Sequence, residues 1–513
     1  MSQDGGSCSA QPAEQSTTGT DTELQVLSFQ PSDPFDPRNF SFWRKWTIVG
    51  SITLIDLTVS WGASGYSPAQ EKLTESFHVS SEIGVLGLSL YILGLALGPM
   101  TLAPLSEYYG RTYLYIVPYG TFLLFLLGTA LVQSIGAFLV LRFLSGLFAS
   151  VTIANFGGTI ADLWPRDQIG PAMSVFLWAA VCGSPSGYLL MSFVAQSRGW
   201  REVFWALLGI CGGFWVILVV VLVVFKNETR RSVILRRRAG RINKAAGRVI
   251  ATVSPEMQSK SLGQLFKDTL ARPFRFLATE PVIVFAALYN GFLYGLSFLF
   301  NSAFNLVFGK MGYGFTTVGV GLCFLGLIVG INLGPLVNTW QENHYQQRIR
   351  AAGIRGAQPE EALDPGQDER FKNIPEARVQ LGKLASILLP VSLFWFAWTS
   401  PPQYHIHWIV PILATTLFGY SFYTLILMTY LYVEDSYMVF SASALAGVGL
   451  IRNLAGAGFP LFGKQMFLNL GYNWAGTILA CLAVLLVPIP FILERYGPRL
   501  RARSSWARQH MDD

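Results

Sequence analysis

The sequence predicts an all-α integral membrane protein with twelve transmembrane helices in two six-helix halves. Of its 513 residues, 52% are hydrophobic and 13% are charged, whereas soluble domains have a charged share of about 25%. The apolar residues form long runs, and each membrane span needs about 20 of them. Twelve spans fit this length, and a similar Gly-Pro feature ends the second span of each half. These observations argue against a soluble enzyme.

Charged residues, Gly, Pro and Asn bound the apolar runs and so place the spans. The first half is expected to span the membrane at residues 46–66, 84–104, 112–132, 136–160, 171–195 and 203–225. The second half is expected to span it at residues 281–305, 316–336, 383–400, 408–432, 438–463 and 473–493. The predicted organisation is a disordered N-tail at 1–45, an N-terminal half at 46–225, a basic linker at 226–280, a C-terminal half at 281–493 with a flexible loop insert at 337–381, and a C-tail at 494–513.

Basic residues are distributed unequally between the two sides of this arrangement. The N-tail and the segments on its side of the membrane hold 30 of the 37 Lys and Arg residues. Cytoplasmic segments carry such an excess, so we expect both termini in the cytoplasm. The expected location is the plasma membrane. The linker has 13 basic and 4 acidic residues. It is interpreted as a solvated segment whose helices lie on anionic headgroups rather than as a specific binding site.

The two halves resemble each other at the end of their second spans. Gly98-Pro99 is followed by Glu107 and Arg111, and Gly334-Pro335 is followed by Glu342 and Arg348. Gly and Pro are expected to form a turn there, with Glu107 and Arg111 paired one helical turn apart. Such a repeat is typical of transporters that bind their substrate between two halves.

Several longer segments resemble the twelve-span drug:proton antiporters of fungi, a branch of the major facilitator superfamily. They are GPMTLAPLSEYYGR at 98–111, RFLSGLFASVTIANFGGTIADLW at 142–164, GSPSGYLLMSFVAQSRGWREVFW at 183–205 and SALAGVGLIRNLAGAGFPLFG at 443–463. The resemblance implies the major facilitator fold. It also implies a gating loop that latches the halves, with Gly98, Glu107, Gly110 and Arg111, and an antiporter-motif turn with Gly183, Pro185 and Gly187, where Ser184 replaces a glycine of the family form.

Three ionisable residues lie deep inside predicted spans. Asp56 is the only carboxylate so placed, and the two bases are Arg142 and Arg452. A charge at that depth costs about 2.5–3.5 kcal/mol or more unless it is paired or hydrated, which makes such residues functional candidates. By the family resemblance, Asp56 is expected to meet Arg142 or a cationic substrate, and both residues are assigned to proton coupling. The alternatives are a structural bond from Asp56 to a Thr or Asn, and bonds from Arg452 to backbone carbonyls.

Polar and aromatic residues of spans 7 and 10 are candidates for the substrate-binding wall. They are Tyr289, Asn290, Tyr294, Tyr420, Phe422, Tyr423 and Tyr430, with Arg452 from span 11. For each aromatic residue, ordinary packing is the alternative.

The predicted function is export of small amphipathic drugs, toxins or secondary metabolites by proton antiport with alternating access. The alternatives are transport of a polyamine, an organic acid or a sugar, and, from another class, a membrane sensor or enzyme. No nucleotide site is expected, because the glycine-rich run ending at Lys464 lacks the Ser or Thr that would hold magnesium. No zinc site is expected, because the five cysteines show no CxxC spacing. No cofactor, no metal and no nucleic-acid partner are expected. The expected partners are a small-molecule substrate, protons and the lipid bilayer, with the protein acting as a monomer.

Overall fold

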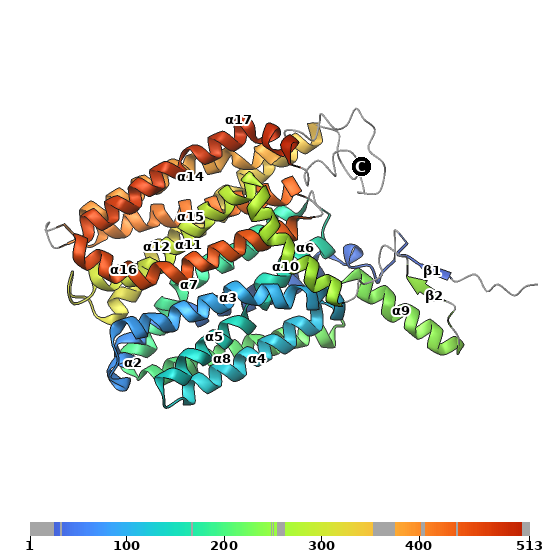
Figure 1. Ribbon diagram of the computed structural model, residues 1–513, viewed down its shortest axis with the longest axis horizontal. Helices are drawn as coiled ribbons and strands as arrows, with labels where there is room; N and C mark the ends of the chain where they lie inside the picture. The colour runs from blue at the N-terminus through green and yellow to red at the C-terminus, as the bar shows by residue number, and fades with distance from the viewer. Residues whose placement is uncertain are drawn as a thin grey trace, which may run out of the picture.

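The computed structural model describes residues 25–30, 33–165, 168–247, 249, 251–253, 262–351, 375–401, 406–437 and 440–504. Its long helices lie side by side in one bundle (Figure 1), with the blue-to-green first half below and the yellow-to-red second half above. Two short strands are the only sheet in this part of the chain. The predicted all-α class is therefore confirmed.

The helices of the first half overlap the six spans expected there. Span 4 consists of two consecutive helices, and span 6 ends in a π-helical turn, η4. The elements are α1 (Phe42–Ser64), η2 (Ser67–Ala69), α2 (Gln70–Phe77), α3 (Ser81–Tyr109), α4 (Arg111–Leu131), α5 (Ile135–Ala149), α6 (Val151–Leu163), α7 (Ile169–Ser197), α8 (Trp200–Val219) and η4 (Val220–Val224).

The second half repeats this arrangement after an intervening segment. The intervening segment holds α9 (Arg231–Ala246), β2 (Ala251–Val253) and α10 (Leu262–Thr279). The second half consists of α11 (Pro281–Phe308), α12 (Thr317–Ala351), η6 (Pro375–Val379), α14 (Gln380–Thr399), α15 (Ile409–Tyr437), α16 (Ser441–Leu486) and α17 (Pro488–Arg503).

Eleven described segments are long and apolar enough to cross a membrane, and the last of them, Ser441–Arg503, contains two predicted spans. Its 63 residues would extend about 95 Å as one helix at 1.5 Å per residue, far more than a bilayer. Gly471 interrupts α16 with φ 78° and ψ 161°, a conformation that favours glycine. Before this break Lys464 contacts Ser81 at the start of α3, and after it Arg501 contacts Glu376 at the other end of the bundle. The chain therefore reverses at Gly471, which makes twelve crossings.

Glycines allow the same close helix crossing in each half. A Cβ on Gly146 would collide with the Tyr91 carbonyl where α5 crosses α3, and one on Gly330 would collide with the Thr416 carbonyl where α12 crosses α15. Small residues permit such approach between membrane helices. Gly98 belongs to this packing too, because α3 continues through Pro99 to Tyr109. The predicted turn at Gly98-Pro99 is thus wrong, since membrane helices tolerate an internal proline.

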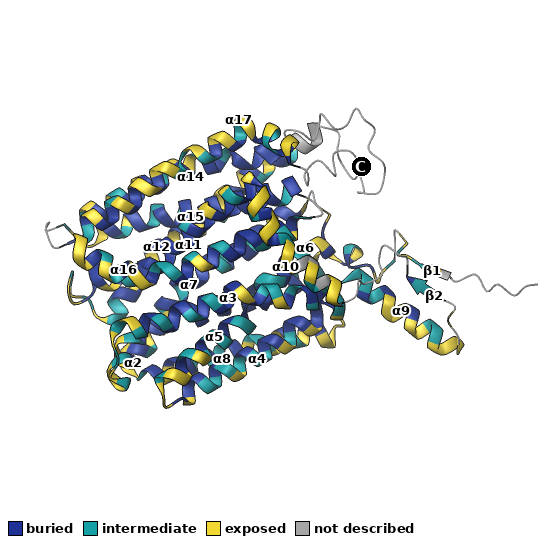
Figure 2. Cartoon of the chain, viewed as in Figure 1, coloured by how far each residue is buried: buried dark blue, intermediate teal, exposed yellow. Residues whose placement is uncertain are grey.

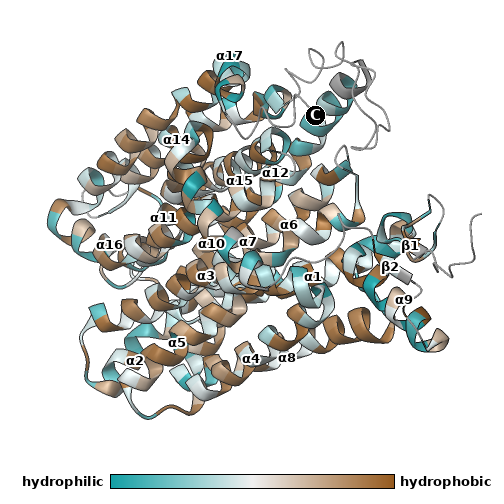
Figure 3. Cartoon of the chain, turned by 45° about the vertical axis from the view of Figure 1, so that its right-hand side comes forward, coloured by the Kyte–Doolittle hydropathy of each residue, from teal (hydrophilic) through white to brown (hydrophobic). Residues whose placement is uncertain are grey.

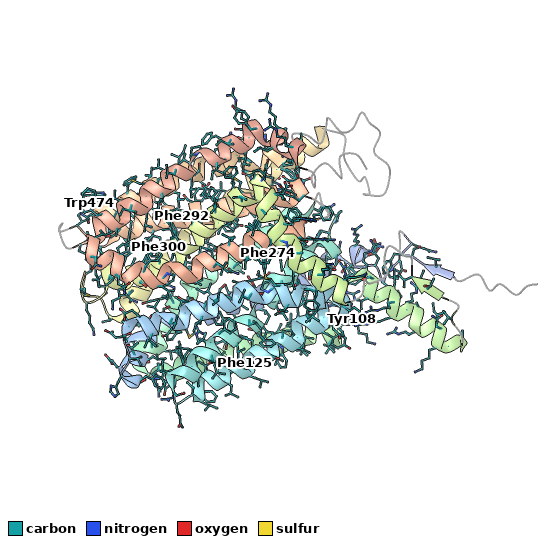
Figure 4. The ribbon with its side chains drawn as sticks, viewed as in Figure 1. Tyr108, Phe125, Phe274, Phe292, Phe300 and Trp474 are labelled. Atoms are coloured by element: carbon teal, nitrogen blue, oxygen red, sulfur yellow. The ribbon has the colours of Figure 1, made fainter. Side chains whose placement is uncertain are left out.

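The outer faces of the bundle are apolar and the buried faces lie between helices (Figures 2 and 3). Leu124 on α4 is 67% exposed and Leu485 on α16 is 72% exposed, as lipid-facing side chains are. Tyr108 and Trp474 lie at opposite ends of the bundle (Figure 4), where aromatic residues meet membrane interfaces.

Strand β1 (Gln25–Leu27) pairs in parallel with β2 beside α9, at the end of the bundle where α9 projects (Figure 1). Leu27 and Phe29 pack on Leu235 and Val253. We call β1, the turn η1 (Pro37–Asn39), α9 and β2 the clip module. At the same end, α10 packs across α3 and α16, and so bridges the halves.

The structure corrects two expectations about polar segments. Part of the predicted disordered tail, between residues 25 and 41, forms β1 and η1, because its apolar side chains find a partner surface on α9. The predicted flexible insert at 337–381 begins with the helical continuation of α12 to Ala351 and ends in the buried turn η6. The remainder of these two predictions falls on residues 1–24, 31–32 and 352–374, and part of the predicted C-tail falls on residues 505–513; all of these lie outside the described residues.

Candidate transport site

A small cavity lies between the two halves. It is lined by α1, α3, α6 and α7 of the first half and by α11, α15 and α16 of the second. The space open to the centres of water molecules is about 30 Å³. One water needs about 10–15 Å³ by this measure, whereas a drug-sized ligand occupies a pocket of roughly 300–1,000 Å³. A substrate of that size therefore requires the halves to separate.

Hydrogen bonds between the halves close the seam on both sides of this cavity. Toward the α2 end, Lys464 Nζ donates to Ser81 Oγ at 3.0 Å. Toward the α9 end, the hydroxyls of Ser174 and Tyr423 lie 2.6 Å apart. The structure is thus a state in which the halves touch at both ends.

Asp56 lies in α1 with its carboxyl group in the wall of the cavity. The side chain is buried, with 2% exposure. Thr152 Oγ1 on α6 donates to Asp56 Oδ1 at 2.6 Å, and Oδ2 is buried with no hydrogen-bond partner in the described chain. One carboxylate oxygen is therefore held in place, and the other is available to a proton or a ligand.

Arg142 is fully buried and binds backbone carbonyls. Its guanidinium donates to Gly87 O at 3.0 Å, Gly62 O at 2.8 Å and Ala63 O at 3.3 Å, and its Cζ lies 4.6 Å from the ring centroid of Tyr91. The expected contact between Asp56 and Arg142 is not formed among the described residues, because these carbonyls on α1 and α3 take the guanidinium donors. In this structure Arg142 ties α5 to both helices.

Arg452, rather than Arg142, shares the cavity with Asp56. Its Nη1 donates to Tyr430 OH at 2.6 Å, and its Cζ lies 4.4 Å from the ring centroid of Tyr294. The next residue, Asn453, donates to Leu95 O across the seam at 3.2 Å. Arg452 and Asp56 interact electrostatically without forming an ion pair. The expected bonds from Arg452 to backbone carbonyls are replaced by these side-chain partners.

Of the expected aromatic wall, Tyr294 and Phe422 line the cavity, whereas Tyr289, Asn290, Tyr420, Tyr423 and Tyr430 are not part of its lining. Asn290 Nδ2 donates to Thr429 Oγ1 at 2.7 Å, and Tyr423 closes the seam. Tyr289 is buried with its hydroxyl unpartnered in the described chain, and Tyr420 is half-buried.

Further lining residues were not among the predicted site residues. They are mainly small or apolar, including Ser60, Ser184, Ser297, Phe298 and Asn453. Such types occur throughout the spans, so their position toward the seam is a result of helix rotation that the sequence does not display.

The predicted gating loop lies at the junction of α3 and α4, where Gly110 has φ 99°. Arg111 Nε donates to Asp162 Oδ2 at 3.3 Å, and its Nη1 donates to Ser106 Oγ at 2.6 Å. The expected ion pair of Arg111 with Glu107 is absent from the described residues. The physical reason is the break at Gly110, which places the two residues on different helices and removes the helical spacing that the pairing needs.

Glu228, which sequence reasoning missed, completes this junction. Its carboxylate accepts hydrogen bonds from Arg111 N at 2.9 Å and Thr112 N at 3.4 Å, so it caps the N-terminus of α4, where a helix favours an anion. Asp162 also pairs with Arg230 Nη1 at 3.7 Å. All these residues lie in the first half or directly after it, so the ion pairs stabilise that half rather than latching the two halves together.

The second half contains a matching cluster before α14. Arg378 Nε donates to Asp435 Oδ2 at 3.1 Å and Arg378 Nη1 pairs with Glu342. The arginine that corresponds to Arg111 is therefore Arg378. The expected counterpart Arg348 lies on α12, and its side chain falls outside the described residues. The sequence conceals this repeat because the insert separates Glu342 from Arg378.

The predicted antiporter-motif turn is helical, since α7 runs from Ile169 to Ser197 through Pro185. Gly183 and Gly187 face α1, where a Cβ on Gly187 would lie 2.9 Å from Trp61 Cα and one on Gly183 would collide with Ser60. These glycines bring α7 against α1 beside the cavity. Any larger residue there would push apart two helices that carry the site.

Two six-helix halves around a buried cavity with one charged side chain from each half define a membrane transporter that works by moving the halves against each other. The Major Facilitator Superfamily matches residues 52–438 of the chain. The MFS-type efflux pump MFS2 of Trichophyton rubrum is 36% identical over 491 residues, covering 96% of this chain and 78% of the relative. The transporter sorT of Penicillium rubens is 35% identical, covering 96% of this chain and 90% of the relative. The multidrug transporter mdrA of Aspergillus fumigatus is 35% identical, covering 96% of this chain and 77% of the relative.

Solved structures share the fold at low sequence identity. The proton:xylose symporter XylE superposes with a TM-score of 0.58 at 15% identity, covering 89% of this chain and 97% of that one. The human organic anion transporter MFSD10 superposes with a TM-score of 0.56 at 16% identity, covering 87% of this chain and 99% of that one. The chain belongs to the Major Facilitator Superfamily. It is a multi-pass membrane transporter rather than an enzyme, and the predicted family and fold are confirmed.

Proposed function

We propose that this protein exports small amphipathic compounds, such as drugs, toxins or secondary metabolites, in exchange for protons by alternating access. The single observation that carries the proposal is the buried carboxyl group of Asp56, whose Oδ2 has no partner within the described chain and which lies between the halves. Relatives that match nearly the whole chain are named efflux pumps and a multidrug transporter, which supports the direction of transport.

Antiport requires that proton and substrate bind in turn rather than together. A single carboxylate meets this requirement, because a proton on Asp56 removes the charge that would hold a substrate donor. In the proposed cycle Asp56 is protonated while the cavity faces outward, substrate leaves, and deprotonation toward the cytoplasm restores affinity. Each proton moved inward would supply about 2.3 kcal/mol per 100 mV and about 1.4 kcal/mol per pH unit.

The orientation in this proposal places both termini in the cytoplasm of a plasma-membrane protein that acts as a monomer. The basic linker supports it, because α9 carries six Lys and Arg residues and no acidic residue. The end of α17 lies at the same end of the bundle as the clip module (Figure 1). Arg111, Glu107, Gly98 and Gly110 then belong to the cytoplasmic end, where the packing of α3 on α4 and α5 keeps the first half rigid as it moves.

The test is uptake into everted vesicles across a compound panel, with and without an imposed pH gradient. Asp56→Asn is expected to abolish gradient-driven uptake while leaving protein abundance unchanged. Ser51→Ala is the matched control, because Ser51 lies buried on the same helix and, among the described residues, its hydroxyl bonds only to Ile48 O. Full gradient-driven transport by Asp56→Asn would remove Asp56 as the proton carrier.

A further inference from the structure

We propose that the substrates are electrically neutral amphipathic molecules whose polar head carries a hydrogen-bond donor and an acceptor side by side, and that this head bridges Asp56 and Arg452. The inference rests on the proposed export function and specifies the substrate class that the cavity takes.

The lining of the cavity contains two charged side chains, one from each half. Asp56 belongs to α1 and Arg452 to α16, and they are 2% and 3% exposed. The other lining residues are uncharged. Substrate that contacts both charges would therefore contact both halves, as alternating access requires.

The free hydrogen-bonding groups of this pair are complementary to one kind of ligand head. Asp56 Oδ2 can accept a hydrogen bond, and it is buried without a partner in the described chain. Arg452 uses Nη1 on Tyr430 and Nε on Asn453, and its Nη2 makes no hydrogen bond to the described residues. One acceptor and one donor are thus available together, and a carboxamide, phenol or enol head would satisfy both.

Charge balance selects a neutral ligand. With Asp56 ionised and Arg452 protonated the cavity has no net charge, so a cationic or anionic ligand would leave one buried charge uncompensated, which is costly. The remaining groups that interact electrostatically with Asp56, or bond to it, come from five other helices and carry no charge near neutral pH: Tyr91 on α3, Tyr115 on α4, Thr152 on α6, Tyr294 on α11 and Tyr430 on α15. Arg142 lies outside the lining and is held by carbonyls.

The apolar wall fits the body of such a ligand. Ile92 and Leu95 line the first-half side, and Phe298 and Phe422 line the second-half side. The ring of Tyr294 lies beside both Arg452 and Phe422, with its centroid 5.9 Å from that of Phe422. A flat aromatic body can stack there while its head reaches the charged pair.

Protonation then releases the ligand by changing the same two contacts. A proton from outer water forms an O–H bond on Asp56 Oδ2, which converts the acceptor into a donor and leaves Arg452 without a counter-charge. The ligand head loses its accepting partner and departs. The proton later returns to cytoplasmic water, and the carboxylate is restored.

The test measures binding of three naphthalene probes by the purified full-length protein in detergent at pH 8. The probes share one body and carry a carboxamide, an aminomethyl cation or a carboxylate. Wild type is expected to bind the carboxamide at least tenfold more tightly than either ion. Arg452→Gln is expected to favour the cation at least tenfold, and Asp56→Asn to favour the carboxylate at least tenfold, whereas the conservative Arg452→Lys keeps the wild-type ranking.

The double variant Asp56→Asn/Arg452→Gln restores net neutrality, so it is expected to bind the carboxamide most tightly of the three probes, but more weakly than wild type does. A wild type that prefers an ion, a ranking unchanged by the single substitutions, or no binding of any probe would overturn the inference. If the vesicle experiment shows gradient-driven export while the charge ranking fails, the substrate class is wrong and the export function stands. If the ranking holds while no export is driven by the gradient, the proposed function is wrong.

Discussion

At the residue scale, two buried arginines have different environments. Arg142 donates to three backbone carbonyls and is surrounded by aromatic rings. Arg452 instead lines the cavity, donates to the Tyr430 hydroxyl and lies over the Tyr294 ring. Carbonyl oxygens that lose their donor inside a membrane protein have no water to replace it. Arg142 therefore holds α1, α3 and α5 together, and Arg452 is placed to meet substrate.

The environment of Arg142 predicts a loss of stability when it is replaced. Arg142→Gln is expected to lower stability by about 3 kcal/mol, because it leaves carbonyls of Gly62 and Ala63 unbonded. Thermal unfolding of the purified protein measures the loss, with Arg201→Gln as a control, since Arg201 is exposed and bonds one carbonyl.

The double variant with Asp56→Asn separates the two roles of Arg142. If Arg142 does not pair with Asp56, the two stability losses add to within about 0.5 kcal/mol. A double variant clearly more stable than Arg142→Gln would show that the two side chains are each other's counter-charge.

At the element scale, helix ends at the α9 side depend on residues far away in the sequence. Glu228 caps α4 from beyond α8, and β1 pairs with β2 across more than 200 residues. Asp33 and Asp36 add ion pairs to Arg238 and Arg231 of α9 at 2.8 and 3.1 Å. The linker between the halves is thereby attached to the chain that precedes α1.

For the cap, Glu228→Gln is expected to destabilise the protein by about 1 kcal/mol, because the α4 N-terminus loses an anion. Glu107→Gln is the comparison, since Glu107 forms no ion pair in the described chain, and its effect should stay below about 0.5 kcal/mol. Thermal unfolding measures both. A larger loss for Glu107→Gln would restore the predicted pairing of Glu107 with Arg111.

For the clip module, Leu27→Asp is expected to increase hydrogen exchange of the α9 amides about tenfold, because Leu27 packs on the apolar face of α9. The matched control is Val26→Asp on the same strand, whose side chain is 54% exposed. Hydrogen-exchange mass spectrometry follows both variants. Equal exchange in the two would mean that β1 does not hold α9 in the membrane-bound protein.

At the scale of the whole molecule, hydrogen bonds close the seam between the halves at both ends, and at the α2 end Val318 N also donates to Gln196 Oε1 at 2.9 Å. Ser174 meets Tyr423 at the α9 end, and Ser81 meets Lys464 at the α2 end. Each such bond contributes about 0.5–1.5 kcal/mol, so no single one of them commits the protein to one state. Alternating access needs this near balance, because a substrate or a proton must be able to shift it.

Breaking one bond should shift the populations toward the state open at that end. Tyr423→Phe is expected to raise the alkylation rate of a cavity cysteine from the α9 end up to about tenfold. Lys464→Gln is expected to raise the rate from the α2 end by a similar factor. Alkylation of Ser60→Cys, which lies in the cavity wall, from each side of sealed vesicles measures access. Changes of the same sign in both variants would contradict the assignment of these contacts to opposite ends.

The spans, the two-fold repeat and the depth of Asp56 follow from the sequence, because hydrocarbon excludes charge and demands about 20 apolar residues per crossing. Which arginine faces Asp56 was decided by the tertiary structure, because rotation and crossing of helices set side-chain partners across a bundle. Carbonyls of α1 and α3 take Arg142, while α16 turns Arg452 toward the seam. The partners of Arg111 and Arg378 were hidden for a related reason: their carboxylates are distant in sequence and meet them only when the helices pack.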